Sequence, residues 1–281
     1  MKINVFSSGS AGNSTLIEIA DKKILVDAGI SKKMIEENLN KKGLSINDIS
    51  MLFITHEHED HIRSLQALIK YDNITIFLTK GTYDYIFNSY KVKNANLLKK
   101  LEERLTQGTI KILSKIGDNS IFYKSFEIDN LKIDVLPTFH DASESVGFIF
   151  HENDKKIVYI TDTGYVHQSL YELISNADAY ILESNHDPEI LMHSNRPYNL
   201  KIRILSNHGH LSNEDSMVTL AHVMGNKTKL VMHAHISQEC NLGQIVEMTR
   251  KKVLDEYAID TEGIDFVVLN PYPSKEYEVW K

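Results

Sequence analysis

Three histidines and an aspartate crowd into six consecutive positions of the chain. The segment reads His56-Glu57-His58-Glu59-Asp60-His61, and it directly follows residues 51–55, an apolar run that predicts a buried strand. Imidazole nitrogens and carboxylate oxygens are suitable ligands for zinc, manganese or iron. Without a metal ion, these groups would face one another at the strand's end without partners. The segment therefore predicts a metal site, and a polar turn that happens to be rich in histidine is the alternative.

Four more residues that can bind metal lie in the same setting, directly after an apolar run. They are Asp27, His140, Asp162 and His235. His233 lies two positions before His235, and the period of two of a strand would place both on the same side. Because side chains from strand ends can converge on one edge of a sheet, we expect this second group to share a site with residues 56–61.

The elements that must position these residues alternate between strands and helices. Strands are predicted at 2–6, 15–19, 23–26, 51–55, 74–78, 110–113, 121–128, 131–136, 146–150, 157–160, 179–182, 230–232 and 266–269. Helices are predicted at 32–41, 62–70, 81–107, 168–175, 187–204, 213–224 and 241–257, with Ser31 and Ser212 as N-caps. Two mixed sheets with helices on their outer faces are the simplest layered solution, and no linker divides residues 1–281, which predicts a single domain.

Composition places the chain among ordinary globular proteins. Of its 281 residues, 42% are hydrophobic and 25% charged, and the net charge of −7 is weak evidence against a broad basic surface for nucleic acid. Cys240 is the single cysteine, so an internal disulfide is excluded. No segment has the pattern of a signal peptide or of a membrane span, and we expect a cytoplasmic protein without a membrane partner.

Several segments together resemble the metallo-β-lactamase superfamily, and more narrowly its YycJ/WalJ (VicX) branch. The superfamily pattern is His-x-His-x-Asp-His at 56–61 followed by the later His140, Asp162 and His235. The resemblance to the branch lies in the segments 7–14 (SSGSAGNS), 26–29 (VDAG), 161–165 (TDTGY), 183–187 (ESNHD), 209–213 (GHLSN) and 235–237 (HIS). This resemblance implies an α/β fold, a four-layer αββα sandwich of two mixed sheets with outer helices.

The resemblance also implies a centre of two divalent metal ions, zinc or manganese. One ion would be held by His56, His58 and His140, the other by Asp60, His61 and His235, with Asp162 bridging them. Asp27 would lie just outside and orient the ligands by hydrogen bonds. The His-x-Ser pattern at 235–237 favours His235 over His233 as the ligand. The catalytic aspartates would thus be Asp27, Asp60 and Asp162.

The activity that the resemblance implies is a 5′-to-3′ exonuclease on DNA. Two ions about 3.5–4 Å apart can share a bridging hydroxide, which would be the nucleophile. The alternative enzymes are other hydrolases of the superfamily: a tRNA 3′-processing endonuclease, a small-molecule phosphodiesterase or a thioesterase. A regulatory module that keeps the fold without catalysis is a third hypothesis, and the complete ligand set argues against it.

Candidate substrate contacts lie in loops next to these segments. The loop 7–14 can direct N–H groups and hydroxyls at an anion, or can simply form a tight turn. An anion could sit at the N-terminus of the helix predicted at 213–224, although capping of that helix also explains the pattern. The polar helical stretch 81–107 matches no segment of the family and could form one wall of a groove. The candidate substrate contacts are Ser10, Asn13, His186, His210 and His233.

Overall fold

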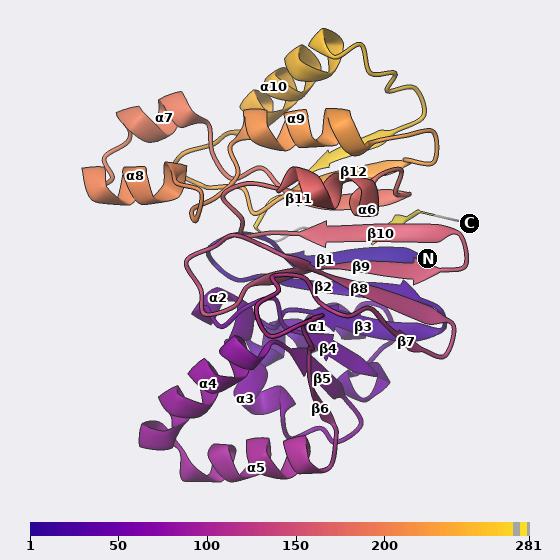
Figure 1. Cartoon of the computed structure of the whole chain (residues 1–281), viewed down its shortest axis with the longest axis vertical. Coiled ribbons are helices and arrows are strands. Elements are labelled where there is room, and N and C mark those ends of the chain that lie inside the picture. Colours follow the sequence, from indigo (N-terminus) through magenta and orange to yellow (C-terminus); the bar gives the residue numbers. More distant parts are fainter. Residues whose placement is uncertain (272–275, 280–281) are drawn as a thin grey trace. The chain divides into compact units, whose positions relative to one another are not determined.

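The computed structural model describes residues 1–271 and 276–279, and of residues 90–93 it describes the backbone only. Internal contacts divide the chain into two compact units (Figure 1). Unit 1 comprises Met1–Lys124 and Ala142–Val146 together with the C-terminal strand, and unit 2 comprises Ser125–Asp141 and Gly147–Pro271. Each unit contains one sheet of seven strands. The single domain predicted over 1–281 stays a prediction.

The sheet of unit 1 has the strand order β14-β1-β2-β3-β4-β5-β6. The first three strands of the chain pair antiparallel, whereas β3 to β6 pair in parallel. Because β1 and β3 both run antiparallel to β2, the carboxyl ends of β1, β3 and β4 lie at the same edge. The strands are β1 (Lys2–Ser7), β2 (Ser14–Ile19), β3 (Lys22–Val26), β4 (Met51–Phe53), β5 (Thr75–Leu78), β6 (Ile110–Ile112) and β14 (Glu276–Glu278).

Helices pack on one face of this sheet through an apolar core. Alternate residues of the parallel strands, such as Leu52 and Ile76, face buried side chains of the helices, such as Leu39 and Leu101. Figure 1 shows α3, α4 and α5 grouped beside β4, β5 and β6. The helices are α1 (Lys32–Asn40), the 3-10 helix η1 (Ile46–Asp48), α2 (Glu59–Ile62), α3 (Leu65–Leu68), α4 (Lys80–Lys93) and α5 (Ala95–Thr106).

The sheet of unit 2 has the strand order β13-β12-β11-β10-β9-β8-β7, in which β10 to β13 pair in parallel. Its strands are β7 (Phe126–Ile128), β8 (Leu131–Pro137), β9 (Val146–Glu152), β10 (Lys155–Ile160), β11 (Ala179–Glu183), β12 (Leu230–Ala234) and β13 (Asp265–Val268). Its helices are η2 (Gln168–Leu170), α6 (Tyr171–Ile174), α7 (Pro188–His193), α8 (Tyr198–Leu205), α9 (Asn213–Val223) and α10 (Gly243–Glu256). Leu220 and Val253 of α9 and α10 pack in one core with Tyr180 and Val231 of the sheet.

The predicted pair of mixed sheets flanked by helices is confirmed, as are the caps at Ser31 and Ser212. Three predicted helices are wrong in extent. The helix predicted at 81–107 is split into α4 and α5 at Asn94, whose side chain accepts the N–H of Leu97 (3.2 Å). The helix predicted at 62–70 is split into α2 and α3, because the N–H of Ser64 donates to the carbonyl of Ala28 (2.8 Å) instead. The helix predicted at 187–204 is split into α7 and α8 ahead of Pro197. The proline ring clashes with the residue before it and disfavours a helical conformation at that residue.

Two strand predictions also need correction. The strand predicted at 121–128 forms only over β7, preceded by a single bridge between Lys115 and Tyr123. Strand β14 was not predicted at all; it pairs with β1, where Lys2 forms ion pairs with Glu276 and Glu278. None of the described helices combines the length with the apolar composition that crossing a bilayer requires.

A buried carboxylate joins three strands at one end of the sheet of unit 2. Asp134 on β8 lies 2.7 Å from Nε2 of His151 on β9, accepts a hydrogen bond from the hydroxyl of Ser125, and lies 3.4 Å from Nζ of Lys132. Burial by itself would raise the pKa of Asp134, but these hydrogen bonds and charges outweigh it and hold the pKa at about 2. Because this value lies below the ordinary 3.8, the ionised carboxylate stabilises the fold above pH 4.

Replacing Asp134 with asparagine should therefore destabilise the protein in a pH-dependent way. At pH 7 we expect a loss of about 1–2 kcal/mol in the free energy of unfolding. The deficit relative to the unmodified protein should shrink as the pH falls from 4 toward 2, where the unmodified protein loses the same contribution. Urea unfolding at pH 7, 4 and 3 measures this. Glu127→Gln, an exposed neighbour on β7, is the control, and a deficit that is equal at pH 7 and pH 3 would contradict the assignment.

Candidate metal centre

Three loops of unit 1 meet at the carboxyl ends of β1, β3 and β4. The N–H of Asn13 donates to the carbonyl of Asp60 (2.7 Å), and the N–H of Ala28 donates to the carbonyl of His61 (2.8 Å). Gly29 makes this approach possible, because a Cβ at this position would lie 1.6 Å from the carbonyl oxygen of Asp60. The close approach of the histidine-rich loop therefore requires a glycine at position 29.

Asp27 holds the imidazole of His61 in place. Its Oδ2 lies 2.8 Å from Nδ1 of His61, and its Oδ1 accepts the N–H of Thr55 (2.9 Å). A carboxylate can only accept, so Nδ1 of His61 carries the proton and Nε2 keeps the lone pair that binds a metal ion. Burial raises the pKa of Asp27, and the charge and hydrogen bond of His61 oppose that rise. Asp27 is thus in hydrogen-bond contact with His61, one of the predicted ligands, and its predicted role of orienting the ligands stays a prediction.

The other predicted ligands of unit 1 surround the same point. Nε2 of His56 lies 3.0 Å from Nδ1 of His58, and the ring centroids of His56 and His61 are 4.0 Å apart. The side-chain amide of Asn13 lies 3.0 Å from Nε2 of His61 and 3.4 Å from Oδ2 of Asp60. Asn13 is fully enclosed among these groups. Its contacts are with the predicted ligands Asp60 and His61, and the substrate contact predicted for Asn13 stays a prediction.

Unit 2 assembles a second cluster at the carboxyl ends of its parallel strands. Asp162 follows β10, Glu183 ends β11, His235 follows β12, and His210 lies in the loop before α9. One ligand atom of each of these four residues lies within 4.8 Å of the others. Asp162 and His235 have left-handed backbones, with φ of 55° and 53°, as does Asp27 in unit 1 at 60°. Such conformations are strained for these residue types and gather at functional sites.

Glu183 is the centre of hydrogen bonding in this cluster. Its Oε1 lies 2.8 Å from Nδ1 of His210 and 2.7 Å from Nδ1 of His235, and its Oε2 accepts the N–H groups of Thr163 (2.9 Å) and Leu211 (3.2 Å). Burial alone would raise the pKa of Glu183, but the charge and hydrogen bond of His210 and the bond to His235 outweigh it, and the pKa is about 2. An ionised Glu183 accepts from Nδ1 of both imidazoles, which leaves the lone pair of each ring on Nε2.

His140 also has its Nδ1 held by an acceptor, which here is a backbone carbonyl and not a carboxylate. Its Nδ1 donates to the carbonyl of Gly209 (3.0 Å), so its Nε2 also keeps the lone pair, and this atom lies 3.9 Å from Oδ1 of Asp162. Oδ1 of Asp162 lies 3.3 Å from Nδ1 of His235. Burial lowers the pKa of His140, which favours the neutral imidazole that binds metal.

These donor sets fit divalent metal ions. His61, His140 and His235 each commit Nδ1 to an acceptor and keep the lone pair on Nε2, which is the usual arrangement of metal-binding histidines. Asp162 and Glu183 are two carboxylates almost fully removed from water in one cluster. A cation bound nearby would stabilise their negative charge, because ionised groups are costly to bury unless they are paired.

His233 does not accompany His235, and the prediction that both lie on the same side is wrong. The left-handed backbone of His235 ends the period of two, so His235 turns to Glu183 while His233 stays on the helix-facing side of β12. There His233 is fully buried, 3.2 Å from the hydroxyl of Ser184 and stacked with Phe266. Burial lowers its pKa to about 3. In this position His233 offers no surface to a substrate.

The remaining candidate contacts differ in their access to solvent. Ser10 is exposed at the tip of its loop, and His210 is half-buried. His186 is buried, which lowers its pKa to about 4, and within the described part of the chain neither of its ring nitrogens forms a hydrogen bond. The loop at Ser10 is a tight turn, because the N–H of Gly12 donates to Gly9 (2.9 Å).

The N-terminus of α9 is already satisfied within the protein. The hydroxyl of Ser212 accepts the N–H of Asp215 (3.1 Å), and the carbonyl of His186 accepts the N–H of Asn213 (2.9 Å). Glu214 and Asp215 add negative charge to the first turn. Since an anion would meet these two carboxylates, the capping explanation of the segment fits this helix better than anion binding does.

Sequence reasoning assigned no role to two residues that organise these clusters. Glu183 directly follows the apolar run 179–182, the same signal that singled out Asp27 and Asp162, and applying it once more would have found Glu183. Thr55 carried no such signal. Its hydroxyl lies 2.9 Å from Oδ2 of Asp27 and 3.0 Å from Nδ1 of His56, a contact that only the folded loop creates.

Comparisons with known proteins agree with this fold and these clusters. Residues 22–234 match the model of a beta-lactamase superfamily domain. The chain is 33% identical over 256 residues to exodeoxyribonuclease YycJ of Bacillus anthracis, covering 91% of this chain and 90% of that protein. It is 33% identical over 272 residues to exodeoxyribonuclease WalJ of Streptococcus pneumoniae, covering 97% and 94%.

A solved structure supports the fold. The metallo-beta-lactamase fold protein YhfI of Bacillus subtilis superposes with a TM-score of 0.66 at 14% identity, covering 98% of each chain. The chain thus belongs to the metallo-β-lactamase superfamily and is a metal-dependent hydrolase. Within the superfamily it belongs to the YycJ/WalJ branch, the family that its sequence motifs resemble.

Proposed function

We propose that the protein is an exonuclease that hydrolyses DNA from a 5′ end with two divalent metal ions, zinc or manganese. The observation that carries this proposal is 33% identity, over at least nine-tenths of both chains, to two proteins named exodeoxyribonucleases. The ligands would be divided as the family resemblance implies. His56, His58 and His140 would hold one ion, Asp60, His61 and His235 would hold the other, and both would share Asp162.

The ions supply positive charge beside the phosphate and a water molecule of lowered pKa. The residues of the chain do the rest. Asp27 holds His61 through a 2.8 Å contact, and Glu183 holds His235 through a 2.7 Å contact, so neither ring can rotate away from its ligand position. These contacts hold both imidazoles in one orientation before any substrate arrives.

His210 is the residue of the second cluster best placed to meet the substrate. Its side chain is partly exposed, while Glu183 fixes its Nδ1 at 2.8 Å. Because Nδ1 carries the proton that it donates to Glu183, Nε2 carries the lone pair and is the atom available to accept a hydrogen bond from the substrate or from a water molecule. Cys240 takes no part in the proposed reaction, because it is buried in an apolar cluster with Leu191 and Ile204.

The test is degradation of DNA with defined ends. Protein loaded with manganese or zinc is incubated with single- and double-stranded DNA that carries a 5′-phosphate and a 3′ label. We expect stepwise loss of nucleotides from the 5′ end, abolished by chelation and restored by adding the metal back. Asp162→Asn protein purified in parallel should release no nucleotides, which excludes a contaminating nuclease.

Other outcomes separate the alternatives. Cleavage at internal positions of RNA only would favour a tRNA-processing endonuclease. Hydrolysis of bis(p-nitrophenyl) phosphate or of a thioester, without attack on any nucleic acid, would favour a small-molecule hydrolase. Equal activity in the unmodified and the Asp162→Asn protein would reject the metal centre as the site of reaction.

A further inference from the structure

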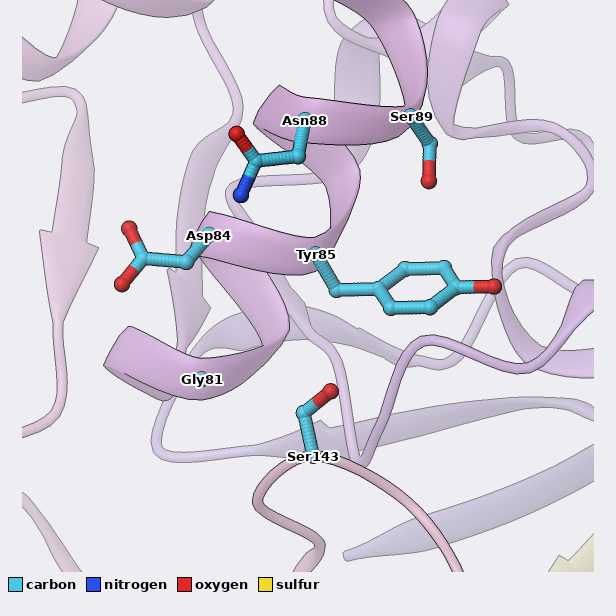
Figure 2. A pocket seen from close by; sticks show the side chains of 6 residues that line it. All are labelled: Gly81, Asp84, Tyr85, Asn88, Ser89 and Ser143. Carbon is cyan, nitrogen blue, oxygen red and sulfur yellow. The ribbon is translucent and has the colours of Figure 1, made fainter.

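A shallow hollow of about 560 Å³ lies on unit 1 beside helix α4 (Figure 2). Its volume is within the range of sites that hold small ligands. Figure 2 shows the ring of Tyr85 extending from α4 to one side and Asp84 and Asn88 directed to the other side, while Ser143 points toward α4 from a loop. The lining residues are Gly81, Asp84, Tyr85, Asn88, Ser89 and Ser143.

The helix α4 presents two different faces. Tyr83 and Ile86 are buried in the core of unit 1, whereas Tyr85 is 50% exposed. Within the described part of the chain, the side chains of Tyr85, Asn88 and Ser89 form no hydrogen bonds with other residues. A large aromatic ring and several polar groups therefore face solvent together, with their hydrogen-bonding capacity unused.

Glu57, a buried residue of the histidine-rich loop, forms hydrogen bonds with residues around the hollow. Glu57 accepts the N–H of Ser143 through Oε1 (2.6 Å) and the hydroxyl of Thr82 through Oε2 (3.3 Å). In the chain, Glu57 lies between His56 and His58, two predicted metal ligands. Glu57 therefore connects Ser143, on the wall of the hollow, to the segment that carries these two predicted ligands.

A second acid fixes the loop against the start of α4. Glu144 accepts the N–H of Gly81 (2.6 Å) and the hydroxyl of Tyr123 (2.8 Å), and it forms an ion pair with Lys115 (2.8 Å). Thr79 also donates to its carbonyl (2.8 Å). A hollow whose two sides are fastened in this way keeps its shape, which favours binding without loss of conformational entropy.

The chemistry of the lining matches a nucleobase. Aromatic rings stack on unpaired bases, and hydroxyls such as those of Ser89 and Ser143, on the side of the Tyr85 ring, can form hydrogen bonds with base edges. A phosphate is disfavoured, because it would meet the charge of Asp84, whose ion-pair partner Lys80 is on the same helix. We propose that the hollow is a subsite for an unpaired base of the DNA strand that the protein degrades, with Tyr85 as its stacking platform. This role rests on the proposed exonuclease function.

The experiment compares Tyr85→Ala, Tyr85→Phe and the unmodified protein on single-stranded oligonucleotides. Since stacking on one aromatic ring is worth about 1–3 kcal/mol per base, we expect Tyr85→Ala to raise KM roughly tenfold with a smaller effect on kcat, and Tyr85→Phe to restore KM. Tyr198→Ala is the matched control, because Tyr198 on α8 in unit 2 is also exposed, at 65%. It should leave KM unchanged.

A direct readout complements the kinetics. Oligonucleotides with phosphorothioate linkages, which slow cleavage, carry the fluorescent base 2-aminopurine at one position near the 5′ end, and this position is varied. We expect quenching at one or two adjacent positions in the unmodified and Tyr85→Phe proteins, and its loss in Tyr85→Ala. Circular dichroism confirms that each variant is folded.

The outcomes distinguish the subsite from the proposed function. If the unmodified protein degrades DNA and Tyr85→Ala has the same KM and the same quenching, the subsite is rejected and the exonuclease stands. If Tyr85→Phe behaves like Tyr85→Ala, stacking is rejected. If the unmodified protein neither binds nor degrades DNA, the exonuclease is rejected and the subsite with it.

Discussion

Replacing Glu183 with glutamine is expected to lower the rate of hydrolysis by about 10²–10⁴-fold while the protein remains folded. Glu183 is fully buried and receives four hydrogen bonds, two of them from the imidazoles of His210 and His235. A glutamine of the same shape presents an N–H₂ group to one of its former donors. One imidazole must then move its proton from Nδ1 to Nε2, which removes the lone pair that binds metal.

The measurement is kcat and KM of Glu183→Gln on a phosphodiester substrate, together with metal content by mass spectrometry. We expect kcat to fall and the metal content to fall with it. Asp178→Asn is the control, because Asp178 is also buried and lies directly before the other end of β11, where it accepts the N–H of Lys156 (2.6 Å). It should keep its activity. Normal kcat and metal content in Glu183→Gln would show that Glu183 does not set the state of these histidines.

Replacing Arg104 with methionine is expected to lower the free energy of unfolding by about 3–5 kcal/mol. Arg104 on α5 is fully buried, yet within the described residues no carboxylate lies within ion-pair distance. Its guanidinium donates instead to the carbonyls of Ile69 (2.9 Å), Tyr71 (3.2 Å) and Ile74, and to the hydroxyl of Thr109 (3.1 Å). Methionine fills the space, but the buried carbonyls of Ile69 and Ile74 lose the donor that the guanidinium supplies.

Denaturation by urea measures this loss. Arg104→Lys should be intermediate, because an ammonium keeps the charge but cannot reach as many acceptors as the planar guanidinium. Lys99→Met on the same helix is the control, since Lys99 is exposed and should change stability by less than about 0.5 kcal/mol. A loss below about 1 kcal/mol for Arg104→Met would mean that water replaces the guanidinium at little cost.

Much of the fold could be predicted because strands and helices follow from local apolar patterns. The runs before Asp27, Asp162 and His235 became β3, β10 and β12, and each candidate residue lies within two positions of the end of its strand. The predictions failed where a distant partner decided the outcome. Ser64 interrupts a helix because it bonds to Ala28, and β14 exists because β1 offers it an edge. Neither partner can be read from the neighbouring sequence.

For the candidate site too, some features follow from the local sequence and others depend on distant residues. The sequence alone determined which residue types could bind metal and which family pattern they follow, because these depend on side-chain chemistry and on spacing along the chain. Only the tertiary structure showed that Glu183 joins His210 to His235, and that His233 turns toward the helices while His235 turns away from them. The direction of a side chain at a strand's end depends on the backbone angle that its neighbours impose. At His235 that angle is left-handed, with φ of 53°, and the pattern of alternation cannot reveal it.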